Sequence, residues 1–392
     1  MLATYWRNFR SHQSAVLLSF MSLSFFSGLG SALFAPILSL FLTNQVHVSP
    51  FAVGLFYTIN AIGGIIFSQL IARYSDRKGH RKRIILICLL MGALNCLLFD
   101  WCRNYYILIS LGIFLMSIGA SAMPQTFALA RDYKDHAGER SVMFTSVMRS
   151  QLSLAWVIGP TIAFALVAAY GFKTLFMAGM GIYIIAFVVT LFKLPDMPKQ
   201  SATGGTHQHH LKTNQDVFKL FIASTLMWGC NSMYIISMPL YISHQLHLPQ
   251  ELAGWMMGTA AALEIPVMLI ASYLTKYWRM KTLLILACVA GLLFYIGMDF
   301  IHSAHLLIVI QLGNAAFIGI LGGLGMIYFQ DLMPGRSGQA TTLFSNSLYT
   351  GNVIAGALAG IIAQYVSYGA TFWVGGGFVA IAAFTLSRIK PI

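Results

Sequence analysis

Charged residues are scarce in this chain. Only 9% of its 392 residues are charged and 58% are hydrophobic, whereas an ordinary soluble domain is about 25% charged. A soluble fold could not cover so much apolar surface, so the composition excludes an ordinary water-soluble protein. It indicates an integral membrane protein whose apolar surface faces lipid.

Acidic residues are scarcer than basic ones: 11 Asp and Glu stand against 24 Lys and Arg, which gives a net charge of +13. An excess of this size can indicate a nucleic-acid partner. Here the basic residues lie in short gaps between apolar runs and form no basic face or arm. We therefore expect no nucleic-acid binding.

Residues that could hold disulfides, metals or catalytic groups are also few. The five cysteines are an odd number, and all but one fall inside apolar runs, so no disulfide framework is expected. All 11 histidines lie outside these runs, and no cluster of Cys or carboxylates completes a tetrahedral set beside them. The sequence predicts no metal and no cofactor. The lack of an intramembrane His and of a Gly-x-Ser-x-Gly motif argues against an enzyme.

Long apolar runs are abundant. Twelve of them can cross a bilayer, and backbone groups in lipid must satisfy their own hydrogen bonds, so each is predicted to be a helix. The predicted spans are 14–42, 51–72, 84–99, 105–130, 143–170, 172–194, 217–242, 253–274, 282–300, 306–329, 341–366 and 368–387. The first is too long for a cleavable secretion signal.

The basic residues predict the orientation. With the N-terminus in the cytoplasm, 21 of the 24 Lys and Arg fall in cytoplasmic segments or at the cytoplasmic ends of spans, Arg103 and Lys173 lie on the other side, and Arg149 is inside a span. Cytoplasmic loops of membrane proteins are enriched in basic residues. Both termini are therefore predicted to be cytoplasmic.

The chain contains an internal repeat. A shift of 200 residues places FLTNQVHVSPFAVGLF, from Phe41, on YISHQLHLPQELAGWM, from Tyr241. The polar stretch 195–216 lies between helices six and seven and is predicted to be a flexible cytoplasmic linker. We expect two pseudo-symmetric six-helix bundles, 1–194 and 217–392, with a solute site between them near mid-membrane, as in alternating-access carriers.

Several stretches carry a family resemblance. DRKGHRK, from Asp76, resembles the Asp-Arg-x-Gly-x-Arg-Lys signature of the major facilitator superfamily, although Ala72 stands where the signature begins with Gly. FAPILSLFL from Phe34, RSQLSLAWVIGP from Arg149 and FQDLMPGRSGQATTLF from Phe329, among others, resemble the bacterial sugar efflux transporter family within it. These stretches run from helix one to helix eleven.

The resemblance implies the major facilitator fold and the export of sugars such as lactose, glucose and related glycosides in exchange for protons. We also expect a monomer in the bacterial inner membrane, whose partners are the sugar, protons and the bilayer. Two alternatives stay open. One is a drug/proton antiporter, although such carriers often place an acid in helix one and the run 14–42 contains none. The other is a sugar facilitator without proton coupling.

Glu264 is the only carboxylate well inside a span, roughly 16 Å deep in helix eight. An ionised carboxylate there is costly, so this one should be neutral or paired. Glu264 is thus a candidate proton carrier. The alternative is a structural hydrogen bond to a neighbouring helix.

Arg149 and Trp156 are seven residues apart on helix five and so lie on nearly the same face. The guanidinium could donate to sugar hydroxyls or neutralise Glu264, while the indole could cover the C–H face of a sugar ring. The alternatives are snorkelling of Arg149 to the cytoplasmic surface and ordinary packing of Trp156.

Other candidate sugar contacts are polar and aromatic side chains in the spans. Trp228, Asn231 and Tyr234 recur every three residues along one side of helix seven, and the resemblance implies that helices one, four, seven and ten line the cavity. For all of these, hydrogen bonds between helices are the alternative. The further candidates are Gln125, Gln311, Asn314 and Asn346, with Asn60, Tyr349 and Asn352 weaker.

Asp76, Arg77 and Arg81 belong to the signature loop and not to mid-membrane. The resemblance implies a cytoplasmic gate in which these charges hold the halves together. An acid such as Asp76 can sit near a helix N-terminus of the other half. For the basic residues, control of topology alone is the alternative.

Overall fold

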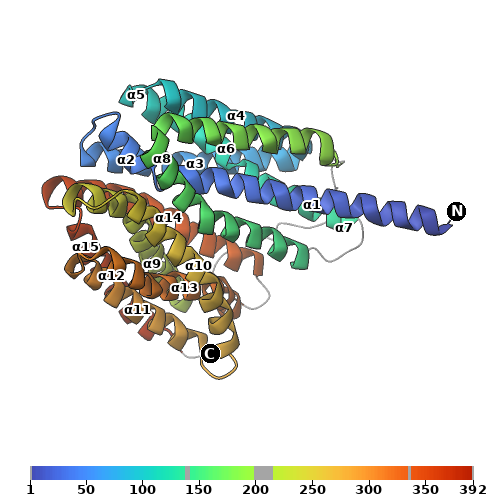
Figure 1. The fold of residues 1–392 in the computed structure, drawn as a ribbon. Helices are drawn as coiled ribbons and strands as arrows, with labels where there is room; N and C mark the ends of the chain where they lie inside the picture. The colour runs from blue at the N-terminus through green and yellow to red at the C-terminus, as the bar shows by residue number, and fades with distance from the viewer. Residues whose placement is uncertain (1, 137–141, 198–214, 334–336, 391–392) are drawn as a thin grey trace. The chain divides into compact units, whose positions relative to one another are not determined.

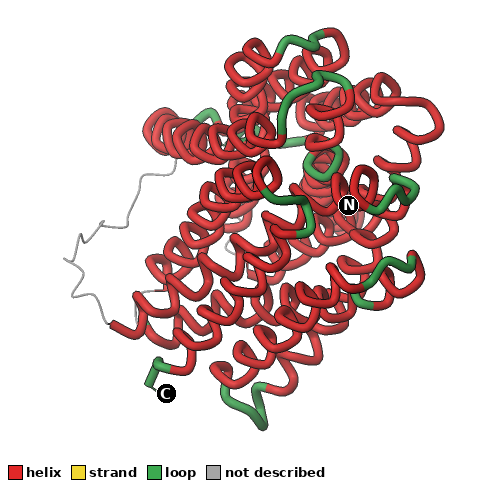
Figure 2. Tube along the Cα trace, turned by 90° about the vertical axis from the view of Figure 1, so that its left-hand side faces the viewer, coloured by secondary structure: helices red, strands yellow, loops and turns green. Residues whose placement is uncertain are grey.

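The computed structural model describes residues 2–136, 142–197, 215–333 and 337–390, which are helices joined by loops, without a strand (Figures 1 and 2). The predicted linker therefore lies mostly outside the described residues. The elements are α1 (Leu2–Phe34), α2 (Leu38–Asn44), α3 (Pro50–Lys78), α4 (Arg81–Trp101), α5 (Tyr105–Ile107), η1 (Leu108–Gly112), α6 (Ile113–Ala120), α7 (Ala122–His136), α8 (Val142–Lys193), α9 (Gln215–Leu240), η2 (Tyr241–Gln245), α10 (Glu251–Leu274), α11 (Met280–Phe300), α12 (Ala304–Val309), α13 (Gln311–Leu332), α14 (Ser337–Tyr365) and α15 (Ala370–Ser387).

Ten segments of the described chain are long and apolar enough to cross a membrane. One of them, Ser150–Lys193, contains two helices that meet at Gly171, whose φ of 81° and ψ of 175° interrupt α8. The remaining long helix is α14, which has 29 residues and many Ser, Thr and Asn in its first half. Counted this way, the described chain confirms an all-α membrane protein with twelve spanning helices.

The chain packs as two compact units, Met1–Ala35 with Ile62–Thr206, and Pro36–Ala61 with His207–Ile392. One boundary coincides with the break between α1 and α2 at Pro36, a residue that has no N–H to continue a helix. The segment Pro36–Ala61 precedes the predicted linker, yet it packs with the elements that follow the linker.

The two copies of the internal repeat fold alike where their sequences match best. His47 and His247 both adopt the left-handed conformation, with φ of 57° and 54°. In each loop the N–H just before this histidine donates to the carbonyl five residues back, at 3.3 Å in the first copy and 2.9 Å in the second. Equivalent sequence therefore produces the same helix-ending turn.

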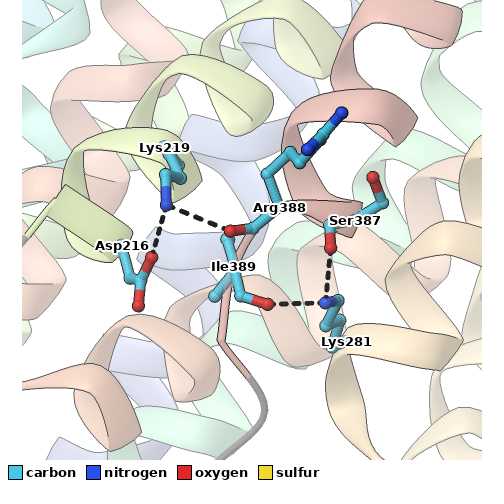
Figure 3. Close-up of polar contacts among 6 residues, drawn as sticks. All are labelled: Asp216, Lys219, Lys281, Ser387, Arg388 and Ile389. Atoms are coloured by element: carbon cyan, nitrogen blue, oxygen red, sulfur yellow. Dashed lines mark hydrogen bonds and ion pairs between the residues drawn. The ribbon is translucent and has the colours of Figure 1, made fainter.

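Cations bind the exposed carbonyl groups at the ends of several helices. Arg103 donates through Nη1 to three carbonyl oxygens at the end of α4, at 2.7, 2.9 and 3.1 Å. At the end of α15, Lys219 donates to Arg388 O at 3.0 Å, and Lys281 donates to Ile389 O at 2.5 Å (Figure 3). Terminal carbonyls lack partners within their own helix and favour positive charge. The three hydrogen bonds of Arg103 to the end of α4 give this residue a structural role at the predicted outer end, where basic residues are rare.

Candidate functional site

The predicted sugar contacts on α9 differ in burial. Trp228 and Asn231 are half-buried, and Tyr234 is buried with its ring against Phe294, 5.3 Å between ring centroids. The Trp228 ring meets Phe344 of α14 edge-on at 6.0 Å. Trp228 Nε1 is enclosed and has no hydrogen-bond partner among the described residues. One side of α9 therefore combines aromatic surface with a donor that is not used.

Tyr234, Gln311 and Asn314 form one buried polar network between α9 and α13. The Tyr234 hydroxyl donates to Gln311 Oε1 at 3.0 Å, and Asn314 Nδ2 donates to the same oxygen at 3.3 Å. Gln311 Nε2 donates to Leu307 O at 3.0 Å. The three side chains are 2%, 0% and 5% exposed, and Asn314 Oδ1 has no partner in the described part of the chain. The structure thus joins three predicted residues and leaves one buried acceptor open.

Glu264 lies on α10 with its side chain half-buried against a glycine-lined face of α13. A Cβ on Gly322 would be 3.8 Å from Glu264 Oε1, and one on Gly319 would be 3.3 Å from Glu264 Cγ. No hydrogen bond or ion pair joins Glu264 to another residue with a described side chain. The glycines therefore make room for a carboxyl group that remains available to a proton or a ligand.

The remaining predicted contacts are more dispersed. Trp156 is half-buried in α8, and Asn346 is exposed on α14. Asn352 accepts a hydrogen bond from Ser232 of α9. The Arg149 side chain lies outside the described residues. Its predicted pairing with Glu264 and its alignment with Trp156 stay predictions.

Arg81 of the predicted gate is the centre of a polar cluster. Its Nε is 2.7 Å from Asp132 Oδ2 in α7, and its Nη1 donates to Ser75 Oγ at 2.9 Å. The same nitrogen donates to Gln125 Oε1 at 3.4 Å, so this predicted sugar contact is engaged by the gate residue. The side chains of Asp76 and Arg77 lie outside the described residues. Their predicted role in the gate stays a prediction.

Sequence reasoning missed two partners of Arg81, Asp132 and Ser75. One signal was available for Asp132, because a shift of 199 residues places it on Asp331 in the second copy of the repeat. An acid kept at equivalent helix ends indicates a charge partner nearby. Ser75 carried no comparable signal.

These side chains suit the binding of a neutral solute rich in hydroxyl groups. Amides and hydroxyls both donate and accept hydrogen bonds, aromatic faces cover apolar C–H surface, and a few such groups in apolar walls give a pocket its specificity. Among the described residues, no group of three or more His, Cys, Asp or Glu could hold a metal ion.

Comparison with known proteins identifies the family. The sequence profile of the Major Facilitator Superfamily matches residues 20–310 and 220–391. The chain is 48% identical to sugar efflux transporter B of Salmonella typhimurium, over 95% of each chain. It is 47% identical to sugar efflux transporter A of Escherichia coli, over 97% of each chain. The chain belongs to the sugar efflux transporter family of this superfamily.

Members of this family are transporters, so the chain is a transporter and not an enzyme. The fold is shared with solved transporters of low sequence identity. The structure of the nucleoside transporter NupG aligns with a TM-score of 0.81 at 15% identity, over 95% of this chain and 98% of NupG. This similarity confirms the major facilitator fold predicted from the sequence.

Proposed function

We propose that the chain exports sugars from the bacterial cell in exchange for protons, by alternating access. The observation that carries this proposal is the buried network of Tyr234, Gln311 and Asn314, with its open acceptor, between otherwise apolar helices. A sugar hydroxyl could donate to that acceptor. The names of the relatives, which are sugar efflux transporters, support the same substrate class.

Glu264 is the proposed proton carrier. A proton-coupled exporter needs a group that binds a proton from one side and releases it on the other. Glu264 is a carboxyl group in the middle of α10, half-buried and without a described partner. Arg149 would neutralise it in one conformation, and Trp156 would cover the sugar ring.

The proposed moving parts are the two halves of the repeat, residues 1–194 and 217–392, joined by the linker 195–216. Both termini are placed in the cytoplasm on the distribution of Lys and Arg. Asp76, Arg77 and Arg81 would close the cytoplasmic end, and the bound pair of Arg81 and Asp132 supports a structured charge cluster there. We propose that one chain is sufficient for transport.

The test is transport by purified protein in liposomes, with labelled lactose or glucose and an imposed pH gradient. We expect chemically unchanged sugar to cross, faster when the gradient drives it. Sugar movement that is independent of the gradient would contradict proton coupling and favour the facilitator. Movement of lipophilic drugs but of neither sugar would favour the antiporter alternative.

A further inference from the structure

Two residues at equivalent positions of the internal repeat bind each other. Asn44 and His244 are 200 positions apart, each four residues into its copy of the matched stretch. His244 Nε2 lies 2.9 Å from Asn44 Oδ1, and because an amide oxygen only accepts, the imidazole nitrogen is the donor. When equivalent positions of two related copies touch, the pseudo-symmetry axis passes between them. The two copies of the repeat therefore meet at this pair.

The segment that carries Asn44 is held against the second copy along its length. Phe51 N–H donates to Gln364 Oε1 at 3.5 Å. Farther along α3, a Cβ on Gly54 would lie 2.5 Å from Gly360 Cα and closer still to Gly356 O. The backbones of α3 and α14 are thus in direct contact. All these residues belong to the compact unit that contains Pro36–Ala61, whereas the chain on both sides of this segment belongs to the other unit.

We propose that Asn44 and His244 form a latch between the two copies of the repeat at their predicted outer end, and that the latch opens once in every transport cycle. This inference rests on the proposed alternating-access function. The physical requirement is a contact that holds and also releases. One exposed hydrogen bond changes the equilibrium between the closed and the open outer end about tenfold at most. The contact between Gly54 and Gly360 has no side chains that would have to separate before the helices move apart.

The position of the latch predicts which end it controls. Asn44 is the last residue of α2 and His244 the last but one of η2, next to the 45–49 and 246–250 loops that the basic residues place outside the cell. Thr58 lies four residues beyond Gly54 on the same face of α3, about 6 Å deeper along the helix, and its Oγ1 donates to Val353 O of α14 at 3.5 Å. A reagent arriving from outside would reach residue 58 only after this end has opened.

The experiment measures that opening. The five native cysteines are replaced by serine, Thr58→Cys is added as a reporter, and a membrane-impermeant maleimide is applied from outside. We expect Asn44→Ala and His244→Ala each to raise the labelling rate about fivefold, as loss of one hydrogen bond implies. The double variant N44A/H244A should label no faster than either single variant, because both remove the same contact. Gln45→Ala is the matched control, since this exposed neighbour has no described side-chain contact.

The exchanged variant N44H/H244N gives the decisive comparison. Because the two positions are equivalent, an exchange keeps one amide and one imidazole facing each other, and labelling should return to the rate of the parent chain. Unchanged labelling in the alanine variants would overturn the latch. So would an exchanged variant that labels as fast as the alanine variants do.

Sugar flux measured on the same reporter chain separates the two proposals. If the parent reporter moves no sugar although its cysteine is labelled normally, the proposed function fails. If sugar moves and the alanine variants label at the parent rate, the latch fails while the proposed function stands.

Discussion

Lys82 and Lys281 bind the ends of helices one repeat apart. Lys82 Nζ, at the start of α4, donates to Leu194 O just after α8, at 2.8 Å. Lys281 Nζ, at the start of α11, donates to Ser387 O at 2.7 Å and to Ile389 O just after α15 (Figure 3). The two lysines are 199 positions apart. Each one ties the last spanning helix of its predicted half to an earlier helix.

Removal of either lysine should therefore destabilise the protein without changing its membrane orientation. Lys281→Met and Lys82→Met keep the apolar stem but leave helix-terminal carbonyls without a cation, which costs about 1 kcal/mol each. The measurement is the thermal unfolding midpoint in detergent. Arg279→Met and Arg83→Met are the matched controls, because these neighbours are exposed and have no described side-chain contact. If the unfolding midpoint falls equally in the variants and in the controls, the loss of stability comes from losing positive charge in general and not from losing the cation at the helix end.

Glu264→Gln should abolish efflux driven by a pH gradient while sugar exchange across the membrane persists. The amide has the shape of the carboxyl group but cannot release a proton. The measurement is flux of labelled lactose or glucose in liposomes, with and without the gradient. Glu251→Gln is the control on the same helix, because Glu251 is exposed in its first turn. Normal gradient-driven efflux in the Glu264 variant would remove this residue from the proton path.

Tyr234→Phe should weaken sugar binding as well as stability. The ring packing against Phe294 is kept, but Gln311 Oε1 loses a buried donor, which costs about 1 kcal/mol. Tyr241→Phe is the control, because that buried hydroxyl donates to Met298 O at 3.1 Å outside the network. We expect similar losses of stability and a higher KM for sugar in the Tyr234 variant alone. An equal change of KM in both variants would mean that the network only braces the helices.

Gly54→Ala should be strongly destabilising, whereas Gly64→Ala on the same helix should not. A Cβ on Gly54 would lie 2.5 Å from Gly360 Cα, so α3 and α14 must separate, which costs about 1–3 kcal/mol. Around Gly64 a Cβ would meet nothing within 4 Å, and alanine favours the helix. The thermal unfolding midpoints of the two variants decide the point. Similar midpoints would contradict close contact of the two backbones.

The fold could be predicted from the sequence because the bilayer leaves few choices. An apolar run of about 20 residues must be a helix there, and Gly171 interrupts α8 between the two predicted spans 143–170 and 172–194. Packing against other helices is not encoded in such runs. The assignment of Pro36–Ala61 to the unit that follows the linker therefore appeared only in the structure.

The candidate site could be predicted as a set of residues but not as contacts. Tyr234, Gln311 and Asn314 stood out because polar groups are rare in apolar helices. The hydrogen bond between Tyr234 and Gln311 depends on how far α9 and α13 are shifted along each other, and no local pattern fixes that shift. Gln125 shows the same limit, because its contact with Arg81 depends on the packing of α4 against α7.

Lys82 shows what counting charges leaves out. In the sequence this lysine counted only toward the predicted orientation, together with the other basic residues. The structure shows a specific acceptor, Leu194 O, that is distant in sequence. A residue that sets orientation during insertion can thus also brace the finished fold, and composition cannot separate these two roles.

The break at Gly171 determines how the sidedness of this protein can be mapped. Two spanning helices meet there with one residue out of helical conformation, so an epitope or protease site inserted at 171 would have no loop to occupy and would force the helices apart. Residues 45–49 form a non-helical loop at the end of α2. A tag that tests the predicted outward orientation therefore belongs in the 45–49 loop, and loss of expression after insertion at 171 would reflect broken helix packing, not the sidedness of that residue.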